Sequence, residues 1–202
     1  MRASREPPGP GRTGCFTERV TDTSIRVTRK VGAAAAVVFD LLANPDRHHE
    51  IDASGMVGDD EDASPITKVG QVFRMNMSSG SGAGEKYQVD NHVTQFQPNR
   101  RIAWEVGLVD GERLGWTWCY DLEPQGHDKS EVALTYDWSA ASPGAREEHP
   151  PPVFGPDQLA ASLDLLDAAL RKSQTGRSAS APGRAGSARR RDPAPSVPRR
   201  TG

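Results

Sequence analysis

Three successive segments in the middle of the chain alternate apolar and polar side chains, residue by residue. Their apolar positions are Ile102, Trp104, Val106 and Leu108, then Trp116, Trp118, Tyr120 and Leu122, then Val132, Leu134, Tyr136 and Trp138. Because successive side chains of a strand point to opposite faces, this pattern is typical of an antiparallel sheet covered on one face only. Large rings on three consecutive strands predict a sheet that curls around a helix or a ligand.

Weaker patterns on either side complete the expected order of elements. Further strands are expected at about 24–30, 70–77 and 87–96. Two short helices, at about 33–43 and 45–49, should meet at Asn44-Pro45, because a residue before proline avoids the helical region. A last helix over about 157–172 carries one leucine stripe, made of Leu159, Leu163, Leu166 and Leu170. The chain is therefore predicted to be α+β, with a curled antiparallel sheet wrapped around a long C-terminal helix.

Composition divides the 202 residues into three parts. Residues 1–20 are rich in Pro, Gly and Arg, and residues 173–202 hold seven arginines against one aspartate, so both are expected to be disordered. The ligand-binding domain is expected over 21–172. The whole chain has a net charge of −2, and both end segments are basic, so the domain between them must be acidic. An acidic domain is a poor nucleic-acid platform. The basic tail leaves a weak contact with nucleic acid or an anionic membrane open.

The chain ends and cysteines favour a cytoplasmic protein. The first fourteen residues contain no apolar stretch of a secretory signal, and no run approaches the length of a membrane span. Cys15 and Cys119 do not suggest a disulfide framework, and Cys119 is expected to be an inert surface thiol.

Five stretches resemble the SRPBCC superfamily of START-related helix-grip proteins, most closely its actinobacterial polyketide cyclase/dehydrase-like group. They are residues 38–45, 48–55, 69–73, 96–105 and 135–139. The resemblance implies a helix-grip fold that holds an apolar ligand between the curled sheet and the C-terminal helix. Two departures stand out: Ile51 precedes Asp52 where the group often has Trp, and the basic tail is not part of the family pattern.

The inward faces supply the candidate ligand-binding residues. They are Phe73, Met75, Tyr87, Asn91, Trp104, Trp116, Trp118, Tyr136 and Trp138. A buried polar group needs a partner, so the polar atoms of this set either orient the oxygens of a ligand or bond to each other and to buried water.

His48 and Asp52 are the candidate catalytic residues, as a general acid or base at the mouth of the cavity. The alternative, which the local sequence favours, is a solvated loop histidine and a turn aspartate. His48, His49, Glu50 and Asp52 do not match a metal-binding motif, and adjacent histidines on a helix point about a quarter-turn apart. We expect no metal and no cofactor.

Three functions remain open at this point. The first is binding of a small, mostly apolar molecule, such as a polyketide, a lipid or an aromatic metabolite. The second is a polyketide cyclase or dehydrase that acts on a poly-β-keto chain in the same cavity. The third, more weakly supported, is a protein-interaction or stress-regulatory module that uses the basic tail.

Overall fold

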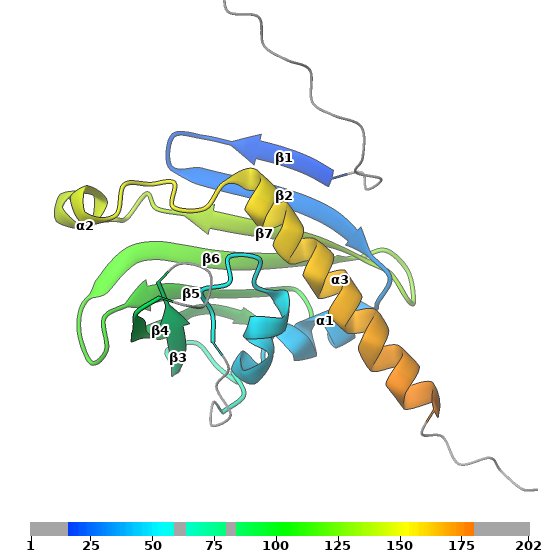
Figure 1. Ribbon diagram of the computed structural model, residues 1–202. Coiled ribbons are helices and arrows are strands. Elements are labelled where there is room, and N and C mark those ends of the chain that lie inside the picture. The colour runs from blue at the N-terminus through cyan, green and yellow to red at the C-terminus, as the bar shows by residue number, and fades with distance from the viewer. Residues whose placement is uncertain (1–15, 59–63, 80–83, 180–202) are drawn as a thin grey trace, which may run out of the picture.

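The computed structural model describes residues 16–58, 64–79 and 84–179, and within them seven strands form one antiparallel sheet (Figure 1). The strands are β1 (Phe16–Val20), β2 (Ser24–Val31), β3 (Val72–Ser78), β4 (Lys86–Gln97), β5 (Arg101–Gly107), β6 (Arg113–Pro124) and β7 (Ser130–Asp137). Their order across the sheet is β1-β2-β7-β6-β5-β4-β3. The chain therefore crosses from β2 to the far edge and returns strand by strand to β7.

The helices are α1 (Ala35–Leu42), η1 (Pro45–Ile51, a 3-10 helix), α2 (Pro143–Glu148) and α3 (Pro156–Ala179). Figure 1 shows α3 crossing the sheet, with α1 close to its second half. Contacts of α3 with β2, β7, α1 and η1 hold it there. This arrangement confirms the predicted fold class, including two short helices between β2 and the next strand.

The strand register sets the predicted rows of rings side by side. Trp104 on β5 lies opposite Trp118 on β6, and Trp118 in turn lies opposite Tyr136 on β7. The next row pairs Tyr120 with Leu134. Cross-strand neighbours on one face are in contact distance, so the alternation in the sequence becomes a continuous aromatic surface on the inner face.

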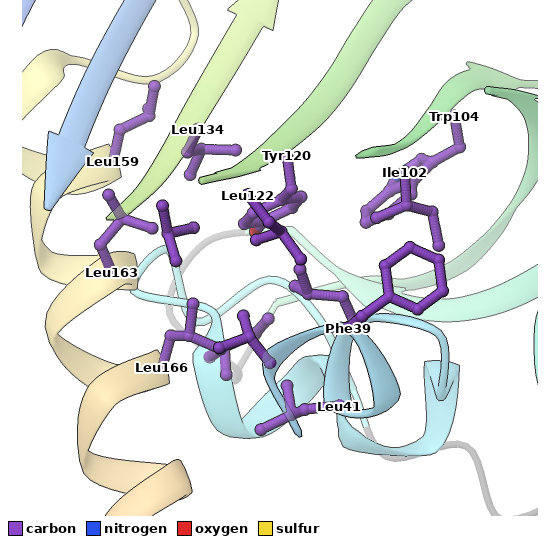
Figure 2. Close-up of a cluster of buried hydrophobic side chains, with 14 of the residues drawn as sticks. Phe39, Leu41, Ile102, Trp104, Tyr120, Leu122, Leu134, Leu159, Leu163 and Leu166 are labelled. Carbon is purple, nitrogen blue, oxygen red and sulfur yellow. The ribbon is translucent and has the colours of Figure 1, made fainter. Parts of the chain in front are cut away.

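The leucine stripe of α3 packs into the inner face of the sheet. Leu159, Leu163, Leu166 and Leu170 are all almost fully buried. Figure 2 shows the first three pointing toward the strands, with Phe39 of α1 and Ile102 of β5 farther from α3 in the same cluster. Burial of one leucine side chain stabilises the fold by roughly 2 kcal/mol, so this stripe fixes α3 over the sheet.

The structure corrects the expected bounds at both ends of the domain. Phe16–Val20 was expected to be unstructured, but it pairs with β2 as an edge strand. The last helix runs to Ala179, beyond the expected end at residue 172, and α2 lies in a segment expected to be a loop. Residues 1–15 and 180–202, which hold Cys15 and most of the basic tail, lie outside the described residues.

One glycine is needed where the segment after β7 meets β6. Gly115 has a φ of +81°, and a Cβ at this position would lie 2.4 Å from the backbone of Ala140. Only glycine tolerates both the positive φ and this close approach. The contact fixes the segment that follows β7 next to Trp116.

Candidate functional site

A cavity of about 280 Å³ lies between the inner face of the sheet, η1 and the first turn of α3. Apolar and aromatic side chains from the five strands β3 to β7, from two loops, and from η1 and α3 line it. Its apolar lining residues are Ile51, Met56, Val57, Phe73, Met75, Met77, Val89, Trp104, Val106, Leu114, Trp116, Trp118, Leu134, Val153, Phe154 and Leu159. The polar lining residues are His48, Asp52, Ser54, Tyr87, Asn91, Tyr120, Tyr136, His149, Gln158 and Ser162.

Four packed rings form the inner wall, which we call the base cluster: His48, Phe73, Trp104 and Tyr120. His48 stacks on Trp104 with ring centroids 5.0 Å apart, and Phe73 meets both rings edge-on at 5.6–5.7 Å. Tyr120 lies 5.8 Å from Trp104 on the other side. Aromatic pairs in such geometries are each worth about 1 kcal/mol beyond their buried area, so this wall is rigid.

Three further rings form an outer wall, the mouth cluster: Trp118, Tyr136 and Phe154. Trp118 stacks on Tyr136 at 4.6 Å, and Phe154 contacts both rings at 5.3–5.5 Å. Phe154 belongs to the segment between α2 and α3, whose Val153 also lines the cavity. This segment is therefore pinned to the sheet and closes part of the cavity.

The rim of the cavity is exposed. Tyr87 of β4 is 38% exposed and Val153 is 45% exposed, whereas most residues of the two ring clusters are buried. His149, which meets Trp116 edge-on at 6.0 Å, is also exposed. A ligand would thus enter between the β3–β4 end of the sheet and the segment that precedes α3.

His48 is buried, which corrects the expectation of a solvated loop histidine. Its side chain is part of the base cluster, and its Nε2 lies 2.8 Å from the carbonyl oxygen of Leu42. Burial lowers the pKa of His48 to about 4, against the smaller raising effect of this hydrogen bond. The imidazole is therefore neutral near pH 7, and since Nε2 must donate to the carbonyl, the lone pair lies on Nδ1.

Asp52 has the turn role that the local sequence favoured. Its carboxylate accepts hydrogen bonds from the backbone N–H groups of Ser54, Met56 and Val57, at 2.9–3.0 Å, and from the Ser54 hydroxyl. These bonds fix the turn after η1 as part of the cavity wall. They also occupy the acceptor positions that a general base would need.

The neutral polar groups of the wall differ from Asp52. Asn91 is 4% exposed and Tyr120 is 6% exposed, yet neither side chain makes a hydrogen bond with another described residue. Burial raises the pKa of Tyr120, with Asp52 adding to the effect, so its hydroxyl stays protonated. An unpaired buried polar group costs about 1–3 kcal/mol, which a ligand or water can offset.

Eight of the nine residues expected to bind a ligand line the cavity: Phe73, Met75, Tyr87, Asn91, Trp104, Trp116, Trp118 and Tyr136. The ninth, Trp138, does not. It is buried in the hydrophobic core with its ring 5.3 Å from that of Tyr136, as the alternation predicts, but it lies outside the lining of the cavity. Sequence reasoning missed the segment with Val153 and Phe154, which has no periodic pattern.

Two further expectations concern reactive side chains. Among the described residues, no group of three or more His, Cys, Asp or Glu side chains could hold a metal ion. Cys119 is half-buried, and burial raises the pKa of its thiol to about 11, with Asp121 adding to the effect. At neutral pH it is a thiol and thus a poor nucleophile.

No helix of the described part is long and apolar enough to cross a membrane.

The comparisons with known sequences are limited in extent. No protein-family model matches the chain. It is 31% identical over 118 residues to the uncharacterized protein Rv0088 of Mycobacterium tuberculosis. The aligned region covers 57% of this chain and 49% of that protein. A second M. tuberculosis protein, MT0096, is 30% identical over the same length. The chain therefore spans about half the length of the curated relatives it matches.

Solved structures identify the fold. Protein NE0264 from Nitrosomonas europaea matches with a TM-score of 0.58 and 14% identity, over 78% of this chain and 99% of that one. A norcoclaurine synthase point mutant from Thalictrum, in complex with a transition state analogue, matches with a TM-score of 0.50 and 14% identity, over 81% and 99%. The chain has a helix-grip fold like that of these solved structures. At these identities the similarity extends to the fold alone.

Proposed function

We propose that the protein binds a small, mostly apolar molecule in the cavity between the sheet and α3. The observation that carries this proposal is the cavity itself. Protein interiors are close-packed and leave few voids larger than one water molecule. A cavity of about 280 Å³ is close to the lower end of the roughly 300–1,000 Å³ of small-molecule pockets.

The lining supports an apolar ligand. The base cluster and the mouth cluster present aromatic surface to the cavity, and Met56, Met75 and Met77 add side chains that adapt to irregular shapes. Burial of apolar ligand area here gains about 25 cal/mol for each Å² removed from water. A largely apolar pocket with a few convergent polar groups is the usual form of a small-molecule site.

Native mass spectrometry of protein purified from its own host tests the proposal. We expect a population with a bound small molecule, released on denaturation. A cavity-filling variant, Val106→Trp, should lose the bound mass, because Val106 is half-buried in the lining. The matched control Val72→Trp, on an edge strand and 47% exposed, should keep it.

Two results would count against a ligand-binding function. One is the absence of any bound mass, together with no uptake of apolar compounds added to the folded protein. The other is equal binding in Val106→Trp and the Val72→Trp control, which would place the ligand elsewhere.

The second candidate function is an enzyme of the polyketide cyclase or dehydrase type, and His48 is the observation that favours it. A neutral imidazole with its lone pair on Nδ1 could take the acidic proton between two carbonyl groups of a poly-β-keto chain. The resulting carbanion would attack a second carbonyl carbon of the chain, which forms the new C–C bond and closes the ring. The alkoxide would take the proton back from the imidazolium of His48, and loss of this hydroxyl with the remaining proton between the carbonyl groups, as water, would give a double bond in the ring. Norcoclaurine synthase, which is an enzyme by its name, has a similar fold and supports this candidate function.

A poly-β-ketoacyl thioester separates the two functions. An enzyme converts it to a cyclised, dehydrated product, and His48→Gln should abolish this conversion while binding persists. Unchanged substrate, recovered from a tight complex with the native protein, would favour the binding function. A rate that stays constant from pH 8 to 5 and falls toward pH 4 would identify His48 as the base, since it must be unprotonated to act.

A further inference from the structure

The charges around the cavity restrict the ligand, if the cavity binds one as proposed above. Among the described residues that line it there is no lysine and no arginine. The carboxylate of Asp52 is occupied by the turn that it stabilises, and His48 is neutral near pH 7. A ligand carboxylate placed inside the cavity would therefore lose its hydration without gaining a cation, which is strongly unfavourable.

Asn91 gives the cavity a polar position far from the rim. It lies four residues along β4 from Tyr87, or about 13 Å at roughly 3.3 Å per residue, and opposite Phe73 of the base cluster. Its amide is neutral, can donate and accept hydrogen bonds, and makes none with another described residue. It thus matches a carbonyl or hydroxyl group that enters the cavity first.

The walls and the size of the cavity favour a ring system over a chain. The base cluster and the mouth cluster lie on neighbouring strands, since Trp104 of the first is opposite Trp118 of the second. Extended aromatic surface favours a planar partner through stacked or edge contacts. The volume of about 280 Å³ is just below the roughly 300–1,000 Å³ of drug-sized pockets, which disfavours a two-chain lipid.

We propose that the ligand is a neutral, planar aromatic compound whose carbonyl or hydroxyl edge is turned inward, toward Asn91. Of the three ligand classes that the sequence left open, namely polyketides, lipids and aromatic metabolites, this proposal selects the aromatic metabolites. It excludes acids that would carry their carboxylate into the cavity. Selectivity should come from the unpaired amide and from the missing cation rather than from apolar area alone.

Equilibrium dialysis of the full chain, freed of bound compounds, against four probes tests this proposal. The probes are 2-acetonaphthone, naphthalene, 2-naphthoate and decan-2-one. We expect 2-acetonaphthone to bind most tightly. Naphthalene should bind about tenfold more weakly, as one hydrogen bond is missing. The carboxylate of 2-naphthoate should weaken binding by about 100-fold or more, and decan-2-one should bind more weakly than its aromatic counterpart.

Variants locate the effect. Asn91→Leu, which keeps the branched shape of the side chain but has no hydrogen-bonding group, should remove the advantage of 2-acetonaphthone over naphthalene. Asn76→Leu, the same change at an exposed position on β3, should keep this advantage. If Asn91→Leu fails to fold by circular dichroism, Asn91→Ser shortens the polar reach and should reduce the same advantage. Val89→Lys, at a half-buried lining position, should raise the affinity for 2-naphthoate by supplying a cation.

The outcomes separate this inference from the broader function. The inference would be overturned if 2-naphthoate bound as tightly as 2-acetonaphthone or more tightly. Loss of this binding in His149→Gln would place the polar group of the ligand at the rim. Tighter binding of decan-2-one would overturn the aromatic class, and an intact ketone advantage in Asn91→Leu would overturn the role of Asn91. In each case the cavity still binds a ligand. Binding of no probe, with no co-purified mass, would overturn both proposals.

Discussion

The buried His48 makes the stability of this fold depend on pH in a defined window. The pKa of His48 is about 4 in the folded protein, and its ordinary value is 6.5. Between these two values the unfolded chain binds a proton at this position and the folded chain does not. The free energy of unfolding therefore falls as pH falls through this window, because protonation stabilises only the unfolded state.

The magnitude follows from the two pKa values. At 1.36 kcal/mol for each pH unit, the difference between 6.5 and about 4 corresponds to a loss of about 3 kcal/mol once the pH is below 4. About 2 kcal/mol of this should already be lost at pH 5. Such a loss is a large part of the 5–15 kcal/mol typical of a domain of this kind.

Urea unfolding, followed by tryptophan fluorescence at pH 7.5, 6 and 5, measures this loss. Carboxylates also titrate at the acidic end, so the relevant quantity is the difference between the native protein and His48→Gln. Glutamine keeps a donor for the Leu42 carbonyl but does not titrate. The stability gap between the two proteins should narrow by about 2 kcal/mol from pH 7.5 to 5.

His49→Gln is the matched control, since His49 neighbours His48 but is exposed. Its unfolding free energy should follow that of the native protein across the pH range. If His48→Gln instead parallels the native protein, His48 is not held neutral by burial, and both the base cluster and the proposed general base lose their support.

Three further predictions concern the walls of the cavity. Trp104→Ala should cost about 3 kcal/mol of unfolding free energy, at the low end for a buried tryptophan because one side of the ring faces the cavity, and urea unfolding would measure it. Asp52→Asn should lower the unfolding free energy by about 2 kcal/mol in the same assay, because hydrogen bonds of the turn are lost. It should leave any catalysis of a poly-β-ketoacyl thioester intact. A loss of rate without a loss of stability would make Asp52 catalytic. Phe154→Ala should lower the unfolding free energy by about 2 kcal/mol, through two lost ring contacts, and speed ligand release in stopped-flow measurements, because Phe154 holds the segment before α3 against Trp118 and Tyr136. An unchanged release rate would show that this segment does not control access.

The sheet and its inner face could be predicted from the sequence because alternation is a local property. Each strand with large rings at every second position must turn them to one side, and the registers of Trp104 with Trp118 and of Trp118 with Tyr136 follow from that. The leucine stripe of α3 is local in the same way. These two patterns were sufficient to place the cavity between sheet and helix.

The remaining features depend on contacts between distant segments. His48 stands among polar neighbours in the sequence, and only its packing against Trp104 and Phe73 buries it. Phe154 lies in a proline-rich stretch without periodicity, and it reaches the cavity because α3 positions it. Trp138 is buried in the core as the alternation predicts, but alternation alone does not tell which inward residues border the cavity and which pack against other side chains.

The four tryptophans of the chain allow the most direct test of the central claim that the inner aromatic face forms a ligand cavity. Three of them, Trp104, Trp116 and Trp118, line the cavity, whereas Trp138 packs against Tyr136 and is not part of the lining. We expect titration of ¹⁵N-labelled protein with 2-acetonaphthone to shift the indole N–H resonances of the first three in a saturable manner, with a much smaller shift for Trp138. Saturable binding that leaves the three lining indoles unmoved would contradict the claim.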